Sequence, residues 1–314
     1  MIRYIFKRLL SLIPVLLGAT FIVFAIMFFT PGDPATIMLP QDATAEDIAM
    51  MRDFLGLNEP FLVQYRDFLL RLAQGDLGNS FRTGQSVLGL ILSRLPATMQ
   101  LATASLVIAI MIGLIAGVVA AVRQYTVWDG GAMVTALLGV SMPNFWLGLM
   151  LILFFAVFWA NSFGYTLLPA SGYGTMQHMI MPAIVLGTAH AAFITRITRS
   201  SMLEVLRQDY IRMAKAKGLS PFKVVFVHAL RNALMPVVTI IGLRFGVLLG
   251  GSVVTERIFA WPGIGRLLID AVRAQDYNVV QGIILTYAII FSLVTLGVDL
   301  LYSFIDPRVK VRYR

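Results

Sequence analysis

The chain has 314 residues, of which 58% are hydrophobic and only 13% are charged, with a mean hydropathy of +0.82. A soluble domain has about one quarter charged residues, so this composition indicates a polytopic membrane protein. The net charge of +9 is better explained by basic cytoplasmic loops than by nucleic acid, and no nucleic-acid partner is expected. Because cysteine is absent, disulfides, cysteine-ligated metals and thiol catalysis are excluded.

The N-terminal segment places Arg3, Lys7 and Arg8 before an apolar run at 9–29. A cleaved signal peptide is the competing interpretation, but its hydrophobic region would be about 7–15 residues long and followed by a small-residue cleavage site. Here the run has 21 residues, enough to cross the bilayer core, and it ends at Pro-Gly-Asp-Pro. We therefore predict a retained N-terminal transmembrane helix over 1–30.

The next segment, 31–94, is too long for a simple loop. Thr44 is followed three residues later by Asp47, which is typical of a capping box at a helix start. A second helix is expected after Pro60, with its aromatic residues on one face: Phe61, Tyr65 and Phe68. We predict a small extracytoplasmic lobe that packs on the membrane part or on a partner, because it is too small for its own core.

Five further apolar runs predict transmembrane helices, at 98–122, 131–160, 181–197, 234–254 and 279–304. We expect Pro96 near the start of the first of these helices and expect Pro143 to kink the second. The prediction is an all-α polytopic membrane protein of six transmembrane helices. Its transmembrane domain covers 95–304, and 305–314 form a C-terminal tail.

Charge sets the predicted orientation. When the N-terminus is placed inside, the inside segments hold 16 basic and 4 acidic residues, whereas the outside segments hold 8 basic and 11 acidic residues. The inside segments are 1–8, 122–130, 196–231 and 305–314, and the outside segments are 31–97, 161–180 and 255–277. This asymmetry predicts cytoplasmic N- and C-termini and an extracytoplasmic lobe.

The stretch 210–236 carries five basic residues and no acid between two predicted spans. Gly218 suits the left-handed position after a helix, Ser220 can cap the next helix, and Pro221 suits its first turn. We predict helix, sharp break, helix, with Leu206, Tyr210, Met213 and Ala214 sharing a stripe on the first helix. An amphipathic helix on anionic lipid and a helix that docks into a cytoplasmic partner explain this stretch equally well.

The stretch "DYIRMAKAKGLSPFKVVFVHALRNALMPVV" resembles the cytoplasmic coupling loop of bacterial ABC-importer permeases, in the form found in the dipeptide and oligopeptide branch. Matching stretches cover essentially the whole chain. They are "PGDP", "LGLNEP", "GDLGNS", "RLPATMQL", "SMPNFW", "MPAIVLG", "TRSSMLEVL", "LLGGSVVTERIFAWPGIGRLLIDAV" and "DLLYSFIDPR". The resemblance favours the docking interpretation of the loop.

What the resemblance implies is a type I ABC-importer permease fold in the bacterial inner membrane. The implied partners are a second permease subunit, two cytoplasmic ATPase subunits and an extracytoplasmic solute-binding protein. ATP and magnesium would be used by the ATPases, so no cofactor and no catalytic residue is expected in this chain. Relatives carry dipeptides, oligopeptides, glutathione, opines or nickel complexes, and the sequence leaves the solute open.

By the same resemblance, 204–231 form the ATPase-coupling loop. Ala214 and Gly218 match the second alanine and the glycine of the family motif, whereas Arg212 and Met213 stand where the motif has its acid and first alanine. Arg231 stands where the wider superfamily has proline. The candidate coupling residues are Tyr210, Arg212, Ala214, Lys215, Lys217, Gly218 and His228.

Two further features lie in the fifth predicted span. Arg244 is a charge at membrane depth, so it is either a translocation-pathway residue that attracts a solute carboxylate or a structural partner of another group. Gly242, Gly246 and Gly250 repeat at four-residue spacing and predict a face that packs closely on another helix. The "WPGIG" stretch at 261–265 is either an outward-facing turn near the binding-protein dock or a mere connection.

Other functional classes lack their required residues. His178, His190 and His228 have no metal-ligand spacing, and the sequence has no phosphate-binding P-loop. An ion-coupled transporter acting alone would need titratable groups within its spans, and a membrane enzyme would need a polar catalytic cluster. The sequence therefore favours the pore-forming subunit of an ATP-driven importer that works by alternating access.

Overall fold

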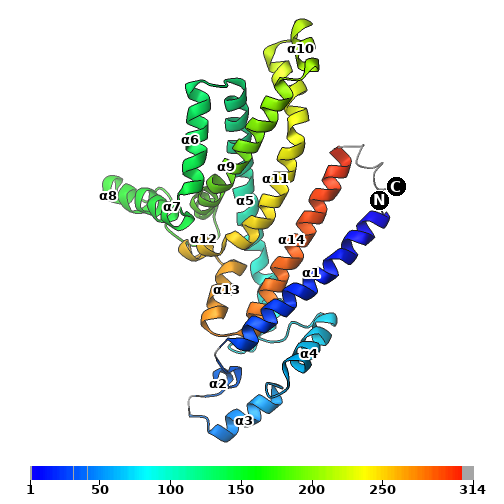
Figure 1. Cartoon of the computed structure of the whole chain (residues 1–314). Helices are drawn as coiled ribbons and strands as arrows, with labels where there is room; N and C mark the ends of the chain where they lie inside the picture. The colour runs from blue at the N-terminus through cyan, green and yellow to red at the C-terminus, as the bar shows by residue number, and fades with distance from the viewer. Residues whose placement is uncertain (1, 31, 41, 306–314) are drawn as a thin grey trace. The chain divides into compact units, whose positions relative to one another are not determined.

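The computed structural model describes residues 2–30, 32–40 and 42–305, and these are mostly helical (Figure 1). The helices are α1 (Ile2–Phe29), α2 (Pro34–Met38), α3 (Ala45–Phe54), α4 (Phe61–Ala73), α5 (Val87–Val122), α6 (Val127–Ser141), α7 (Asn144–Leu151), η1 (Ile152–Phe158), α8 (Trp159–Phe163), α9 (Met176–Leu206), α10 (Asp209–Ala216), η2 (Lys223–Ala229), α11 (Leu230–Gly251), α12 (Val253–Ile258), α13 (Ile264–Arg273) and α14 (Tyr277–Ile305). Here η marks a helix with π-type hydrogen bonding. The all-α prediction is confirmed; the predicted tail lies almost wholly outside the described residues.

Within this described part, six helical segments are long and apolar enough to cross a membrane. They are Leu10–Phe29, Val87–Val122, Asn144–Phe163, Met176–Leu206, Lys223–Gly251 and Tyr277–Val298. The prediction of six spans is confirmed, and several spans are longer than the apolar runs. The predicted position of Pro96 near the start of a helix is wrong, because Pro96 lies inside α5.

The third predicted span is wrong in its bounds. In place of one kinked helix over 131–160, the chain forms α6 and α7 with a break at Met142, whose backbone is extended (φ −80°, ψ 125°). A residue before proline is pushed out of the helical region, so Pro143 ends α6 and caps α7 without kinking a single helix. The spanning segment starts only at Asn144, while α6 packs against α9.

The described chain folds as two compact units. The core unit contains 99–261 and 293–305, and the lobe unit contains 2–98 and 262–292. In the core unit α9 is the most buried span, and α6 and α11 pack along it (Figure 1). The 31–94 lobe predicted from the sequence is therefore part of a larger unit that includes α1, α13 and most of α14.

Glycines bring α5 and α9 close together in the core unit. A Cβ atom on Gly113 would lie 2.6 Å from Ile194, and one on Gly117 would lie 2.5 Å from the Cβ atom of Thr198. Gly187 of α9 approaches Ile108 of α5 in the same way. These contacts exclude any side chain larger than hydrogen, so the two helix backbones approach closely, as small residues allow in membranes.

Aromatic residues hold the lobe unit together. Phe61, Tyr65 and Phe68 of α4 pack against Phe21 and Phe24 of α1, with ring centroids 5.4–5.7 Å apart in five pairs. The Tyr65 hydroxyl lies 3.1 Å from the Thr20 hydroxyl, and Tyr65 also donates to the Leu17 carbonyl. Helix α4 of this segment thus packs on α1, one of the candidate spans. The predicted capping box of Thr44 and Asp47 is also present at the start of α3.

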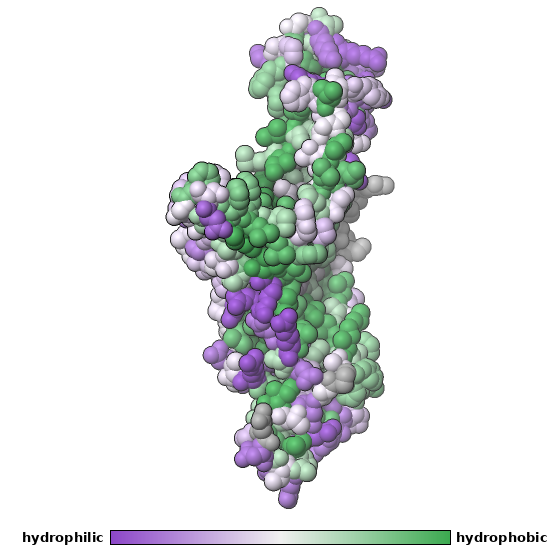
Figure 2. Space-filling model, turned by 90° about the vertical axis from the view of Figure 1, so that its left-hand side faces the viewer, coloured by the Kyte–Doolittle hydropathy of each residue, from purple (hydrophilic) through white to green (hydrophobic). Residues whose placement is uncertain are grey.

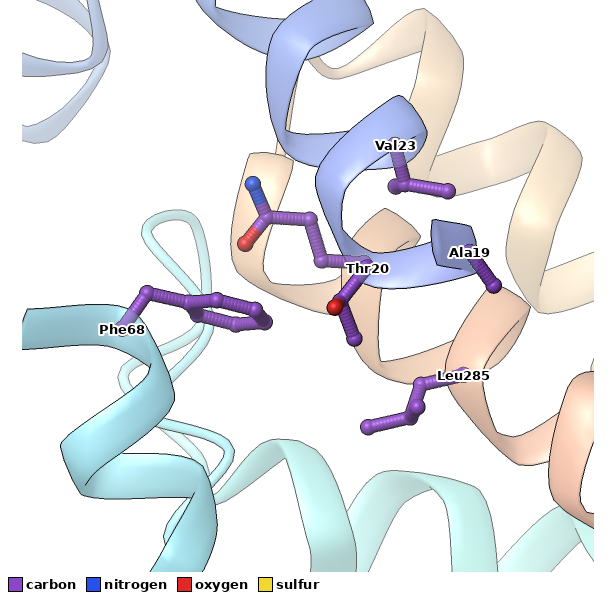
Figure 3. Close-up of a pocket in the computed structure, with 6 residues that line it drawn as sticks. Ala19, Thr20, Val23, Phe68 and Leu285 are labelled. Carbon is purple, nitrogen blue, oxygen red and sulfur yellow. The ribbon is translucent and has the colours of Figure 1, made fainter. Parts of the chain in front are cut away.

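A small cavity remains where α1, α4 and α14 meet in the lobe unit (Figure 3). Its volume is about 10 Å³, and Thr20, Phe68 and Leu285 point toward it. A space of this size holds at most one water molecule, so it is a packing void and not a ligand site.

The "WPGIG" stretch contributes two buried residues to the fold. Trp261 is buried in the core unit, edge-on to Tyr173 with ring centroids 4.8 Å apart. In the lobe unit Ile264 is buried, and its backbone N–H donates to the Thr98 hydroxyl (2.8 Å). Trp261 and Ile264 are thus used in packing, and the choice between an outward-facing turn near the binding-protein dock and a mere connection stays a prediction.

We expect Gly117→Val to destabilise the protein. The new side chain would overlap Thr198 and the Thr195 carbonyl, which lies 2.8 Å from the Cβ position, at a cost of about 1–3 kcal/mol or more. Thermal unfolding of the purified protein in detergent measures this loss. Gly131→Ala is the matched control, because a Cβ atom there meets nothing within 4 Å. Equal unfolding temperatures for the two variants would contradict the close contact of α5 and α9.

Candidate functional site

The segment 204–231 forms a helix, a sharp break and a second helix. The long helix α9 ends at Leu206, the chain turns at Arg207 and Gln208, and α10 runs from Asp209 to Ala216. After the break at Gly218, the chain is helical again from Pro221 through η2 into α11. Figure 1 shows α10 at the end of α9 and near the start of α11.

The break has the hydrogen bonds of a Schellman motif. The Gly218 N–H donates to the Lys215 carbonyl (3.0 Å), and the Leu219 N–H donates to the Ala214 carbonyl (3.3 Å). Gly218 has φ +77°, the left-handed conformation that glycine adopts at little cost. The Lys223 N–H then approaches the Ser220 hydroxyl (3.5 Å) at the start of the next helix. The predicted helix-break-helix geometry is confirmed.

One face of α10 is buried among the ends of the membrane helices. Ile211 and Ala214 lie in a cluster with residues of α5, α9, η2 and α11: Val118, Ala121, Met202, Val224, Ala229 and Ala233. The predicted stripe of Leu206, Tyr210, Met213 and Ala214 is wrong. Leu206 belongs to α9, and the turn at Arg207 and Gln208 gives α10 its own axis, so a different face is buried.

The opposite face of α10 is exposed and has an apolar centre with a basic margin. Tyr210 is 42% and Met213 is 58% exposed. Arg212, Lys215 and Lys217 are exposed beside them, and hydrophilic residues gather at this end of the molecule (Figure 2). The Arg212–Asp209 ion pair (3.5 Å) is itself highly exposed and adds little stability. This face offers a partner two large apolar side chains and several cations.

Asn232 of α11 connects the two ends of the loop. Its side-chain amide donates to the Tyr210 hydroxyl and to the His228 carbonyl, both at 2.9 Å. His228 lies in η2 and is half-buried. Its backbone carbonyl, and not its imidazole, accepts the hydrogen bond from Asn232. The structure therefore brings Tyr210 and His228 together through a residue that the sequence did not single out.

A second missed feature is an ion pair between α6 and α9. The Arg199 guanidinium makes two hydrogen bonds to Asp129, at 2.6 and 2.7 Å, and Asp129 also accepts the Tyr125 N–H (3.1 Å). The pair lowers the pKa of the Asp129 carboxyl below its usual value. Seventy residues separate the partners, so no local pattern could predict the contact.

The remaining candidates lie in α11. The Arg244 guanidinium stacks on the Phe193 ring of α9, 3.4 Å from its centroid. A Cβ atom on Gly242 would overlap Val298 of α14, and Gly246 is buried, whereas a Cβ atom on Gly250 would meet nothing within 4 Å. Close packing is thus seen at Gly242 and not at Gly250, and the packing role of the whole face stays a prediction.

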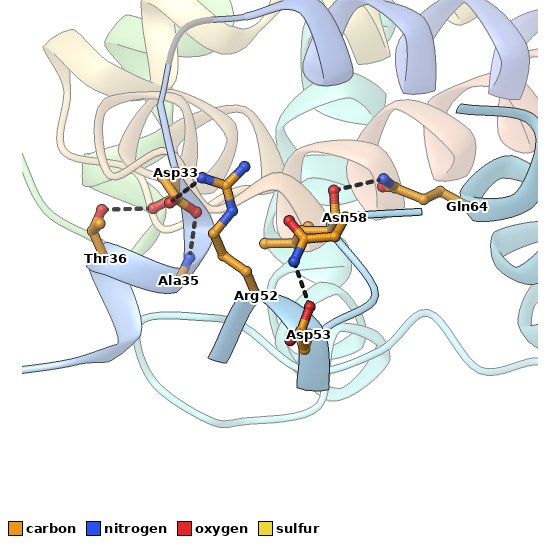
Figure 4. Close-up of polar contacts among 8 residues, drawn as sticks. Asp33, Ala35, Thr36, Arg52, Asp53, Asn58 and Gln64 are labelled. Carbon is orange, nitrogen blue, oxygen red and sulfur yellow. Dashed lines mark hydrogen bonds and ion pairs between the residues drawn. The ribbon is translucent and has the colours of Figure 1, made fainter. Parts of the chain in front are cut away.

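The lobe unit contains a cleft of about 710 Å³, large enough for a small ligand. Asp33 lies in its wall, where it caps α2 through the Ala35 N–H (3.0 Å) and pairs with Arg52 of α3 (3.4 Å), as Figure 4 shows. Asn58 donates to Asp53 just after α3, beside the same wall. These contacts join α2 to α3 and stabilise the wall. Among the described residues, no group of three or more metal-ligating side chains is assembled.

The fold is that of a multi-pass membrane protein in which a short helix, exposed on one face, is anchored to the ends of several candidate spans. Comparison with known proteins agrees with this class. Residues 109–311 match the family described as binding-protein-dependent transport system inner membrane component, and residues 1–102 match its N-terminal companion. The chain therefore belongs to the family of binding-protein-dependent transport system inner membrane components, and it is a permease subunit of an ABC importer.

Curated relatives match over the full chain. The dipeptide transport system permease protein DppB of Alkalihalophilus pseudofirmus is 46% identical, over 99% of this chain and 100% of that protein. The di/tripeptide transport system permease protein DppB of Pseudomonas aeruginosa is 45% identical, over 99% of each chain. The glutathione transport system permease protein GsiC of Escherichia coli is 43% identical, over 99% of this chain and 100% of that protein.

A solved structure supports the fold. The inward-facing methionine ABC transporter MetNI is similar with a TM-score of 0.55 and 18% sequence identity, over 69% of this chain and 96% of that chain. The predicted type I importer permease fold and the inner-membrane location are thus confirmed. The position of the lobe relative to the membrane and the roles of single loop residues stay predictions.

We expect the break in the loop to depend on the conformation of Gly218. Gly218→Val places a β-branched residue at φ +77° and is expected to destabilise the loop by about 1–3 kcal/mol. Gly218→Asn is the control, since asparagine tolerates the left-handed region. Limited proteolysis of the purified protein measures exposure of the loop. If valine and asparagine give the same cleavage rate, the left-handed conformation is not required.

Proposed function

We propose that this chain is the pore-forming subunit of a bacterial importer for short peptides or similar small solutes. The permeases that match it over their full length are named for dipeptides, di/tripeptides and glutathione, which are all peptides. Their shared chemistry supports a solute with a peptide backbone and at least one carboxylate. The chain would form the channel with a second permease subunit and receive solute from an extracytoplasmic binding protein.

ATP would be hydrolysed by two separate ATPase subunits, with magnesium as their cofactor. The sequence of this chain contains no P-loop, which supports a purely mechanical role for it and no enzymatic activity. The exposed face of α10, with Tyr210 and Met213 among cations, is the proposed contact with an ATPase subunit. Arg212, Lys215 and Lys217 would pair with acidic groups at the edge of that contact.

The observation that carries this proposal is the division of α10 into two faces. Its inner face, Ile211 and Ala214, packs on the ends of α5, α9, η2 and α11. A displacement of α10 by the ATPase is therefore transmitted to these helices by direct contact. The Asp129–Arg199 pair would carry the same displacement from α9 to α6. Binding of ATP then shifts the pore between inward- and outward-facing states only to the extent that one state binds the closed ATPases better.

The distribution of charge supports the proposed orientation. The basic loop and both termini would lie in the cytoplasm, and the lobe of 31–94 would lie outside with its cleft toward the binding protein. The inside segments then hold four times as many basic as acidic residues, whereas the outside segments hold an acidic excess.

Uptake by the reconstituted transporter tests the function. We expect vesicles that contain this chain, its partner permease and the ATPases to accumulate a labelled di- or tripeptide only with internal ATP and external binding protein. Neither ATP hydrolysis nor uptake is expected from this chain alone. Uptake by the chain alone under an ion gradient would show instead that it is a secondary transporter.

Two substitutions on opposite faces of α10 test the coupling role. Ile211→Ala removes a fully buried side chain and is expected to lower the stability of the isolated permease by about 2–5 kcal/mol. Met213→Ala changes an exposed side chain and is expected to leave that stability within about 0.5 kcal/mol. Thermal unfolding in detergent measures both.

The same pair is then compared in ATPase binding. Met213→Ala is expected to weaken capture of the ATPase subunits by about tenfold, as the loss of a central interface residue does. If Met213→Ala binds the ATPases normally while binding to anionic vesicles is weakened, α10 is a lipid-surface helix and the docking proposal is wrong.

A further inference from the structure

Arg244 lies deep in a membrane span. It is seven residues before the end of α11, which places it roughly 10 Å from that end at 1.5 Å per residue. The other end of the span, at Lys223, is farther away. A guanidinium at this depth is costly unless it faces a partner or a water-filled cavity.

The contacts of Arg244 supply no anion. Its guanidinium lies over the Phe193 ring, a cation–π contact that does not itself engage the N–H groups. Among the residues that the structure describes, none forms a hydrogen bond or ion pair with Arg244. The free edges of a guanidinium match the two oxygens of a carboxylate.

His190 is a second polar group without a partner beside this site. It lies one turn before Phe193 on α9, the helix whose Phe193 ring Arg244 contacts, and only 8% of the residue is exposed. Its Nδ1 atom is buried and has no hydrogen-bond partner within the described chain. A buried imidazole nitrogen without a partner is unfavourable, and in the tautomer with the proton on Nδ1 a ligand carboxylate oxygen would accept its N–H and relieve this cost.

We propose that Arg244 and His190 form a carboxylate-binding station for the solute, with Phe193 holding the guanidinium plane. Arg244 supplies the charge and the two-pronged donor, and His190 supplies a single N–H. The ligand is the free carboxylate of a peptide-like solute as it passes through the channel. This inference rests on the proposed import of peptides and adds the solute group that the span recognises.

Uptake of two matched peptides tests the station in the complete reconstituted transporter. One dipeptide has a free C-terminal carboxylate, and the other is its C-terminal amide. Arg244→Gln is expected to reduce uptake of the free acid by about tenfold relative to its effect on the amide. Arg244→Lys keeps the charge without the fork and should give a smaller loss. Because every variant uses the same binding protein, its own preference cancels in the ratio.

Equal losses for the two peptides would overturn the proposal. Absence of all uptake by the unaltered transporter would instead contradict the proposed function. The unaltered transporter must carry the amide for this comparison, so a second experiment addresses the station directly.

The second experiment uses the absence of cysteine from this chain. Val247, one turn after Arg244 and 47% exposed, is replaced by cysteine in the complete transporter. The probes are an anionic and a cationic methanethiosulfonate of similar size, with the transporter that lacks Val247→Cys as background. We expect the anionic reagent to modify the cysteine faster than the cationic reagent. The ratio of the two modification rates is expected to fall about tenfold on Arg244→Gln. The free-acid peptide is expected to protect the cysteine from modification more than the amide does.

Two results of that experiment would overturn the proposal. If neither reagent modifies the cysteine, this face is closed to water and to solute. If the anionic preference is absent with Arg244 in place, its charge is already neutralised by another protein group, and the residue is structural.

Discussion

Burial of the inner face of α10 is the contact on which the proposed mechanism depends. An eight-residue helix is not stable alone, because helix nucleation is unfavourable and short helices gain few internal hydrogen bonds. Ile211 and Ala214 stabilise α10 by packing into a cluster built from α5, α9, η2 and α11. The helix is therefore ordered only as part of the membrane helix ends, and it cannot be displaced without them.

The close helix contacts of the core unit make this arrangement stiff. The hydrophobic effect gives little drive to associate helices within lipid, so packing and polar contacts must hold them. Gly113 and Gly117 bring the backbone of α5 against α9. The Asp129–Arg199 pair joins α6 to α9 near the start of α6. A displacement at α10 thus meets a set of spans that are joined to one another, which alternating access requires.

Sequence patterns predicted features that local chemistry determines. The span count follows from hydrophobic length, the capping box from Thr44 and Asp47, and the loop break from Gly218 and Ser220. The error in the third span arose because hydropathy alone decided its bounds. Hydropathy is continuous across Met142 and Pro143, so only the backbone restriction before proline reveals that α6 is separate.

The candidate site divides in the same way. Its location and left-handed glycine could be predicted, but the buried face of α10 could not, because a turn at Arg207 and Gln208 changes the helix axis. The Asp129–Arg199 pair and the Asn232 bonds to Tyr210 and His228 join distant segments. A single sequence contains no periodic signal for such contacts.

The basic residues of the loop and Arg244 differ in the free-energy cost of removing their charge from water, and this difference separates their roles. The cations of the loop are exposed, so water solvates them and their presence is compatible with topology alone, without a specific partner. Arg244 lies within a span, and the described residues offer it an aromatic face but no anion. His190 beside it is buried without a hydrogen bond. The described residues leave two neighbouring polar groups without a hydrogen-bonding partner, and a carboxylate of the transported solute would satisfy both, so the pair is better explained by solute binding than by the stability of this fold.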